Sequence, residues 1–196
     1  MEWPGCEGEV LWFSIRLTPE SAPWAYAKGD PYKVVMSLEA IASLCGIMLL
    51  GTEALQQKGS PAALRAAVSV SGMGDSRGGA QAMAKGASSK FPLCVVLMEM
   101  AVQQEARNLR MDAEWAPRYA NEEADALSRE VTLGFSAGLR RGTAGIEDMK
   151  FIVLDEMMAL AGRFYRELQT ENELALLRPR AARDRKRKRL RDREPW

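Results

Sequence analysis

The stretch of this 196-residue chain that most constrains its fold is residues 115–129, where a strand ends and a helix begins. Residues 109–115 alternate apolar and polar side chains, which is the period of a strand. Asn121 follows a short turn and is placed to cap the next helix, because its side-chain oxygen can accept a free amide of the first helical turn. We therefore expect a strand, a turn and a helix from Asn121 to about Glu130.

Three acidic residues stand in the first turns of this expected helix. Glu122 and Glu123 lie where the positive end of the helix dipole favours acids, and Asp125 follows one turn further in. On spacing alone, Asp125 among small residues is a solvated surface acid.

The rest of the chain alternates between strand-like and helix-like periods. Asp30 is expected to cap a long helix that Pro31 opens, since the missing N–H of a proline costs nothing at the first helical position. Asp75 follows a strand and precedes glycines, which first of all indicates a turn. The expected strands are residues 10–17, 64–74 and 109–115, and the other expected helices are 31–50, 80–90 and 91–107.

The motif W-x-P-R-x-x-N-x-x-A-D-A-L-S-R of residues 115–129 resembles the last carboxylate motif of the ribonuclease H family, in the form that follows reverse transcriptases in retrotransposons. The pattern K-G-D-P-Y-x-V-x-x-x-L-E-A of residues 28–40 is similar to the first helix of these domains, where the glutamate is a catalytic carboxylate. The segment S-K-F-P-L of residues 89–93 resembles them too. The family motif Thr-Asp-Asn-x-Gly-Asn reads Gly-Asp-Ser-Arg-Gly-Gly at residues 74–79, so the acid is kept and its neighbours differ.

This resemblance implies three metal-ligating catalytic carboxylates, Glu39, Asp75 and Asp125. They would hold Mg²⁺ or Mn²⁺ for hydrolysis of the RNA strand of an RNA–DNA hybrid, and such ions take oxygen ligands. The alternatives from the residues alone stay open: Glu39 borders an apolar stripe and can extend to water, and Asp75 can be a turn residue.

Composition excludes several other chemistries. The chain contains no histidine, so Ser-His and Cys-His catalysis are excluded, and three scattered cysteines argue against a disulfide framework or a zinc site. Hydrolytic chemistry must therefore use carboxylates. The longest apolar run is residues 41–50, and no signal peptide is expected, so we expect an intracellular protein, cytoplasmic or nuclear, without a membrane span.

One family element is missing from the match. The family carries a further aspartate on its first strand, and the resemblance begins only near Trp12, so that strand and that ligand have no counterpart here. We expect an α/β fold with an incomplete ribonuclease H-like mixed sheet flanked by helices, followed by a C-terminal amphipathic helix and a basic tail. The expected divisions are a domain over residues 1–130, a linker over 131–145, a helix over 146–177 and the tail over 178–196.

The tail carries most of the positive charge. Residues 178–196 contain ten Lys or Arg and three Asp or Glu, a net +7, which leaves −6 for the remainder of a chain with a net charge of +1. The tail can bind nucleic acid, act as a nuclear import signal, or be a solvated end. Its core is the run Arg185, Lys186, Arg187, Lys188 and Arg189. Three hypotheses follow: a retroelement nuclease, cut from or joined to a polyprotein; an inactive remnant that binds nucleic acid through the tail; and a helical interaction protein.

Overall fold

The computed structural model describes residues 10–27, 29–56, 68–142, 145–160, 162–163 and 167. The chain divides into two compact units, Met1–Met158 and Ala159–Trp196. The fold described below belongs to the first unit, and the described positions of the second unit are helical. The predicted tail, residues 178–196 with its basic run at 185–189, lies outside the described residues.

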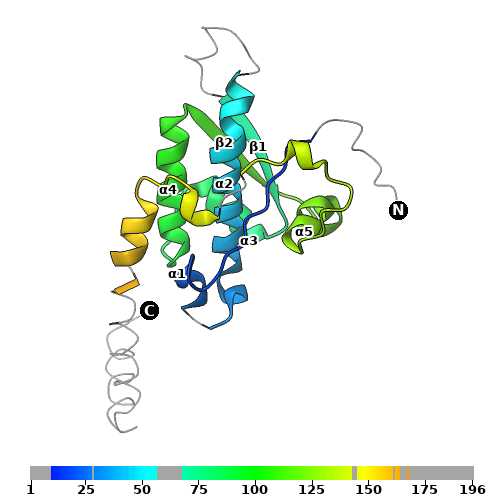
Figure 1. Cartoon of the computed structure of the whole chain (residues 1–196). Helices are drawn as coiled ribbons and strands as arrows, with labels where there is room; N and C mark the ends of the chain where they lie inside the picture. The colour runs from blue at the N-terminus through cyan, green and yellow to red at the C-terminus, as the bar shows by residue number, and fades with distance from the viewer. Residues whose placement is uncertain are drawn as a thin grey trace, which may run out of the picture. The chain divides into compact units, whose positions relative to one another are not determined.

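Two parallel strands form the sheet. β1 (Val68–Gly74) pairs with β2 (Leu109–Trp115) along its whole length, from Val68 beside Leu109 to Gly74 beside Trp115. Both strands are predicted by the two-residue period. Residues 64–67 of the expected strand 64–74 lie outside the described residues. The fold is therefore mixed α/β, with a two-stranded parallel sheet and several helices in the described part of the chain (Figure 1).

The long apolar helix forms where the sequence predicts it. Asp30 accepts a hydrogen bond from the Tyr32 N–H at 3.1 Å, a 3-10 turn η1 (Pro31–Val34) follows, and α2 (Val35–Gln56) continues from it. α2 packs against α4 (Leu93–Ala106), which lies with α3 (Arg77–Lys85) in the connection from β1 to β2. The buried side chains of this layer are Ala40, Ile41, Leu44, Ile47, Val95, Val96, Leu97 and Met100.

The predicted strand over residues 10–17 is wrong within the described structure. This segment is extended, but only Trp12 forms a β-bridge, to Arg140. The alternation of side chains supplies two faces, yet a strand also needs a neighbouring backbone along its length. After this segment, the short helix α1 (Pro23–Tyr26) buries Ala25 against Val34.

The chain after β2 also differs from expectation. A 3-10 turn η2 (Arg118–Ala120) leads into α5 (Glu122–Ser128), which is shorter than predicted. The helix predicted from residue 146 begins at residue 154, because 146–148 form a 3-10 turn η4 (Ile146–Asp148) and 149–153 are not helical. Residues beyond 167 of that prediction lie outside the described part.

The stretch expected to be a linker, residues 131–145, belongs to the first unit and contacts its first described segment. The Trp12 N–H donates to the Leu139 carbonyl oxygen at 3.2 Å, and the Arg141 N–H donates to the Trp12 carbonyl oxygen at 2.7 Å. The Trp12 indole lies against Phe135, and its Nε1–H donates to the Ser136 carbonyl oxygen at 2.7 Å. A 3-10 turn η3 (Ala137–Leu139) lies between these contacts. Residues 135–141 therefore lie against the first segment of the chain.

One helical segment, Pro31–Gly51, has the length and composition of a membrane span, with a mean hydropathy of 2.0. This differs from the expectation drawn from uninterrupted apolar runs, because the few polar residues within it lower its hydropathy little. In the structure 44% of its most apolar window is buried within the protein, and core helices of soluble proteins pass the same test.

Candidate functional site

The carboxyl ends of the two strands place Asp75 beside Trp115. β1 ends at Gly74 and β2 at Trp115, and these residues are partners in the register. The Trp115 Nε1–H donates to the Asp75 carbonyl oxygen at 3.0 Å, and the Arg77 guanidinium lies 4.2 Å from the centroid of the Trp115 ring. Ser76 then caps α3, since its hydroxyl accepts from the Gly79 N–H at 3.1 Å. Asp75 thus directly precedes the N-cap residue of α3.

Glu39 of α2 faces this same turn. Burial raises the pKa of the Glu39 carboxyl above its ordinary 4.5, the charge of Asp75 raises it further, and the Ser76 hydroxyl opposes the shift. Oε2 of Glu39 is buried and has no hydrogen-bond partner among the described residues. A Cβ added at Gly79 would lie 2.6 Å from that oxygen, so a larger residue at this position would displace the Glu39 carboxylate. The structure therefore brings Glu39 and Asp75 together.

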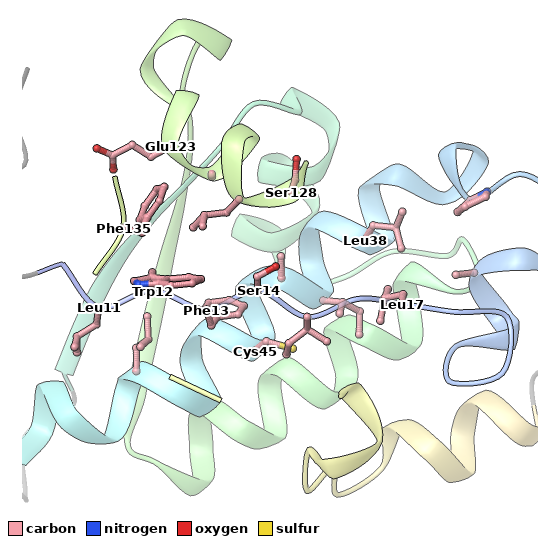
Figure 2. A pocket seen from close by; sticks show the side chains of 18 of the residues that line it. Leu11, Trp12, Phe13, Ser14, Leu17, Leu38, Cys45, Glu123, Ser128 and Phe135 are labelled. Carbon is pink, nitrogen blue, oxygen red and sulfur yellow. The ribbon is translucent and has the colours of Figure 1, made fainter. Parts of the chain in front are cut away.

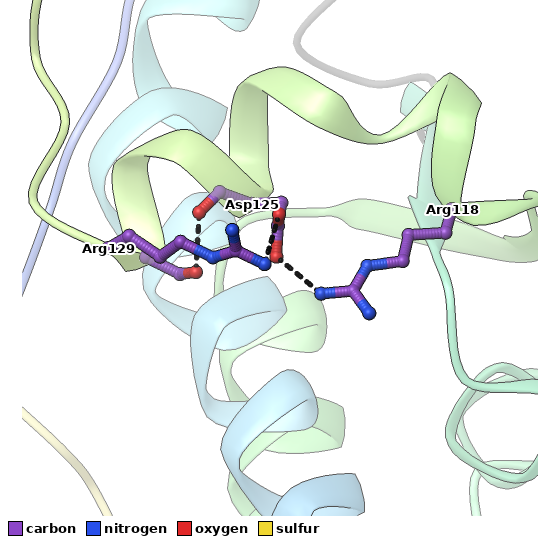
Figure 3. Close-up of polar contacts among 4 residues, drawn as sticks. Arg118, Asp125 and Arg129 are labelled. Carbon is purple, nitrogen blue, oxygen red and sulfur yellow. Dashed lines mark hydrogen bonds and ion pairs between the residues drawn. The ribbon is translucent and has the colours of Figure 1, made fainter.

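Asp125 is held by arginines instead. Its Oδ1 lies 3.2 Å from a terminal nitrogen of Arg118, and its Oδ2 lies 2.8 Å from one of Arg129 (Figure 3). The Ser128 hydroxyl donates to the Asp125 carbonyl oxygen at 2.7 Å. The predicted side-chain cap by Asn121 is wrong: the residue stands at the N-cap position of α5 but makes no capping hydrogen bond.

The three predicted ligands do not gather around one point in the described structure. No group of three or more His, Cys, Asp or Glu side chains that could hold a metal ion occurs within the described ranges. Glu39 and Asp75 supply two neighbouring carboxylates, and one of their oxygens is unpartnered, whereas both oxygens of Asp125 pair with guanidinium groups. The residues as placed fit a pair of acids, and they do not fit the two-metal centre that the resemblance implies.

An apolar pocket of about 560 Å³ lies on the other side of α2, among the first segment of the chain, α2 and α5 (Figure 2). Trp12, Phe13 and Leu17 line it from the first segment, and Leu38 and Cys45 line it from α2. Burial raises the pKa of the Cys45 thiol to about 12, so this cysteine is an apolar wall and not a nucleophile. Glu123 supplies the carboxylate of the lining. The pocket therefore offers space and mainly apolar contact.

Sequence analysis missed Glu99, which is fully buried in α4. Its carboxylate accepts the backbone N–H groups of Ile152, Val153 and Leu154 at 2.9, 2.7 and 2.9 Å. Gln103, one turn along, donates both to Glu99 and to the Lys150 carbonyl oxygen. The sequence signal was an acid and an amide four residues apart within an apolar helical stripe. Glu99 accepts the amides of the two residues before the helix and of its first residue, Leu154, and so anchors the start of that helix.

No family model matches the chain, and neither the curated proteins nor the solved structures contain a significant match to it.

Proposed function

We propose that this chain is a retroelement-derived ribonuclease H-like domain that binds nucleic acid and does not cleave it. The support for the family is the resemblance of residues 12–129, together with the order of α2, β1, α3, α4, β2 and α5. In that order the three implied carboxylates fall on a helix, after a strand, and on the helix after the next strand. An intracellular location, and a surrounding retroelement polyprotein as partner, belong to the same proposal.

The pairing of Asp125 carries the choice of binding over cleavage. Both of its carboxylate oxygens lie within 3.2 Å of guanidinium nitrogens, from Arg118 and Arg129. A carboxylate neutralised in this way offers a metal ion little charge. The net +7 of residues 178–196 supports binding, because lysine and arginine displace the counterions of a phosphate backbone.

Hydrolysis of the RNA strand of an RNA–DNA hybrid is the second candidate function. The observation in its favour is the pair Glu39 and Asp75, with an unpartnered buried oxygen on Glu39. In this alternative, Mg²⁺ or Mn²⁺ is the cofactor, and Glu39, Asp75 and Asp125 are the catalytic ligands. Rearrangement of the Arg118 and Arg129 side chains away from Asp125 would be required.

Cleavage of a labelled RNA–DNA duplex separates the two candidates. The purified chain is incubated with the duplex in Mg²⁺ and then in Mn²⁺, beside the Asp75→Asn and Asp125→Asn variants. We expect binding in a gel-shift assay and no cleavage by any of the three proteins. Cleavage that disappears in both variants would overturn the binding proposal and establish the hydrolytic one.

Binding is tested with the same duplex and a variant in which Arg185, Arg187 and Arg189 are replaced by glutamine. The loss of three charges should weaken binding at low salt and make the logarithm of the affinity fall less steeply with the logarithm of salt concentration. Unchanged affinity would show that the tail does not contribute to nucleic-acid binding.

A further inference from the structure

An exposed tryptophan is held in one orientation at the end of β2. Trp115 is 43% exposed, although an indole is among the side chains that gain most from burial. The hydrogen bond from its Nε1 to Asp75 and the Arg77 guanidinium over its ring come from the end of β1 and the first residue of α3. The ring is therefore fixed from two sides before any ligand arrives, which lowers the entropy lost on binding.

A second exposed aromatic ring follows within a few residues. Tyr119 is 77% exposed in η2, and Arg118 precedes it. Four residues of chain span at most about 14 Å, so the backbones of Trp115 and Tyr119 lie within reach of neighbouring nucleotides of one strand. Flat aromatic and guanidinium groups are the contacts on which unpaired bases stack.

The surrounding charges favour bases over phosphates at this surface. Arg77 and Arg118 are accompanied by Asp75 and Asp125, and Glu114, Glu122 and Glu123 are exposed within eight residues of Trp115 in the sequence. Acids repel a phosphate backbone, whereas stacking on an aromatic face needs no net positive charge. A double helix presents its phosphates outward and keeps its bases stacked on each other, so this surface suits a single strand.

We propose that Arg77, Trp115 and Tyr119 form a stacking platform for unpaired nucleobases, so that this chain prefers single-stranded to double-stranded nucleic acid. This inference rests on the proposed nucleic-acid binding and adds a second surface to it. The basic tail supplies electrostatic affinity for any strand, and the platform supplies the preference for unpaired bases.

The test compares the full chain with single-site variants on a fluorescein-labelled 20-nucleotide oligo(dT) and on the matching dT–dA duplex. Tyr119→Ala and Trp115→Ala should each raise the dissociation constant for the single strand about 5- to 150-fold, the range for loss of one base stack. Tyr119→Phe keeps an aromatic face and should bind like the unchanged chain. Tyr32→Ala is the matched control, because Tyr32 is 68% exposed in η1 and lies outside the platform.

The duplex measurement distinguishes the platform from the tail. The two platform variants should leave duplex affinity unchanged, whereas the tail variant with Arg185, Arg187 and Arg189 replaced should lose affinity for both probes. If Tyr119→Ala and Trp115→Ala bind oligo(dT) as well as Tyr32→Ala does, the platform is overturned and the tail proposal stands. If the unchanged chain binds neither probe, both proposals fail. Circular dichroism of Trp115→Ala and Trp115→Phe checks the fold, and a folded Phe variant must retain single-strand affinity.

Discussion

The Glu39 carboxyl group should make the protein less stable as pH rises. Its folded-state pKa is raised above 4.5 by burial first and by Asp75 second, so the folded protein binds this proton more tightly than the unfolded chain does. The free energy of unfolding therefore falls as pH rises from about 4.5 through the folded-state pKa. Glu39→Gln should raise the melting temperature at pH 7 and flatten this fall. Thermal melts between pH 4 and 8 measure both.

Asp75→Asn gives an internal check on the cause. Removing the charge of Asp75 should make the free energy of unfolding decrease less as pH rises. Part of the decrease should remain, because burial raises the Glu39 pKa more than Asp75 does. Glu114→Gln, at an exposed position of β2, should show the same pH dependence of the melting temperature as the wild-type protein. A Glu39→Gln variant with a lower melting temperature at pH 7 than the unchanged protein would show that the carboxylate stabilises the fold.

Glu99 should be among the most sensitive polar positions of the protein. Glu99→Ala leaves the N–H groups of Ile152, Val153 and Leu154 without their acceptor, and the Leu154 amide is buried. Because an unsatisfied buried donor costs about 1–3 kcal/mol, the free energy of unfolding should fall by at least about that much. Urea titrations followed by circular dichroism measure the loss. Glu105→Ala, at an exposed position of the same helix, should change it little.

The helix starts differ in what their capping residues contribute. Ser76→Ala removes the hydroxyl that accepts the Gly79 N–H, so it should lower the free energy of unfolding by about 1 kcal/mol. Asn121 makes no capping bond at α5, so Asn121→Ala should cost less than about 0.5 kcal/mol. Urea titration of both variants measures the difference. Equal losses would indicate that Asn121 caps α5 in solution.

Elements with a complete local signal were predictable, and the others depended on distant partners. The positions of β2 and α2 could be predicted because the apolar period of each is repeated several times along the element. Asp30 and Pro31 likewise marked the start of η1. The alternation at residues 10–17 predicted a strand that does not form, since its neighbours provide a bridge at Trp12 alone. The helix start at residue 154 could not be predicted from its own sequence, because its acceptor is Glu99, more than fifty residues earlier.

The same distinction applies to the candidate site. The sequence singled out Glu39 and Asp75, and the structure places them together because α3 packs against α2, with Gly79 next to the Glu39 carboxylate. It also singled out Asp125, whose ion pairs with Arg118 and Arg129 of the same motif the pattern does not predict. A motif fixes which residues are present, whereas the pairing among them depends on side-chain geometry.

At the scale of the whole molecule, Trp12 connects the first described segment to residues 135–141. Its buried indole lies against Phe135, its Nε1–H donates to Ser136, and its backbone exchanges hydrogen bonds with Leu139 and Arg141. Trp12→Ala removes the ring and should lower the free energy of unfolding by about 3–5 kcal/mol, the usual range for a large buried side chain. Trp12→Phe keeps most of the ring and loses the Nε1 bond, so its cost should be about 1 kcal/mol.

Hydrogen exchange locates this effect. In Trp12→Ala the Arg141 amide, which donates to the Trp12 carbonyl oxygen, should exchange faster together with its neighbours. Amides of α4 should lose only as much protection as the lower global stability of the variant explains. The reason is that Trp12 supports the contact between two peripheral segments, whereas α4 packs on α2 independently of it. Uniform loss of protection across both regions would instead make Trp12 part of the central core, with residues 135–141 unfolding only when the whole unit does.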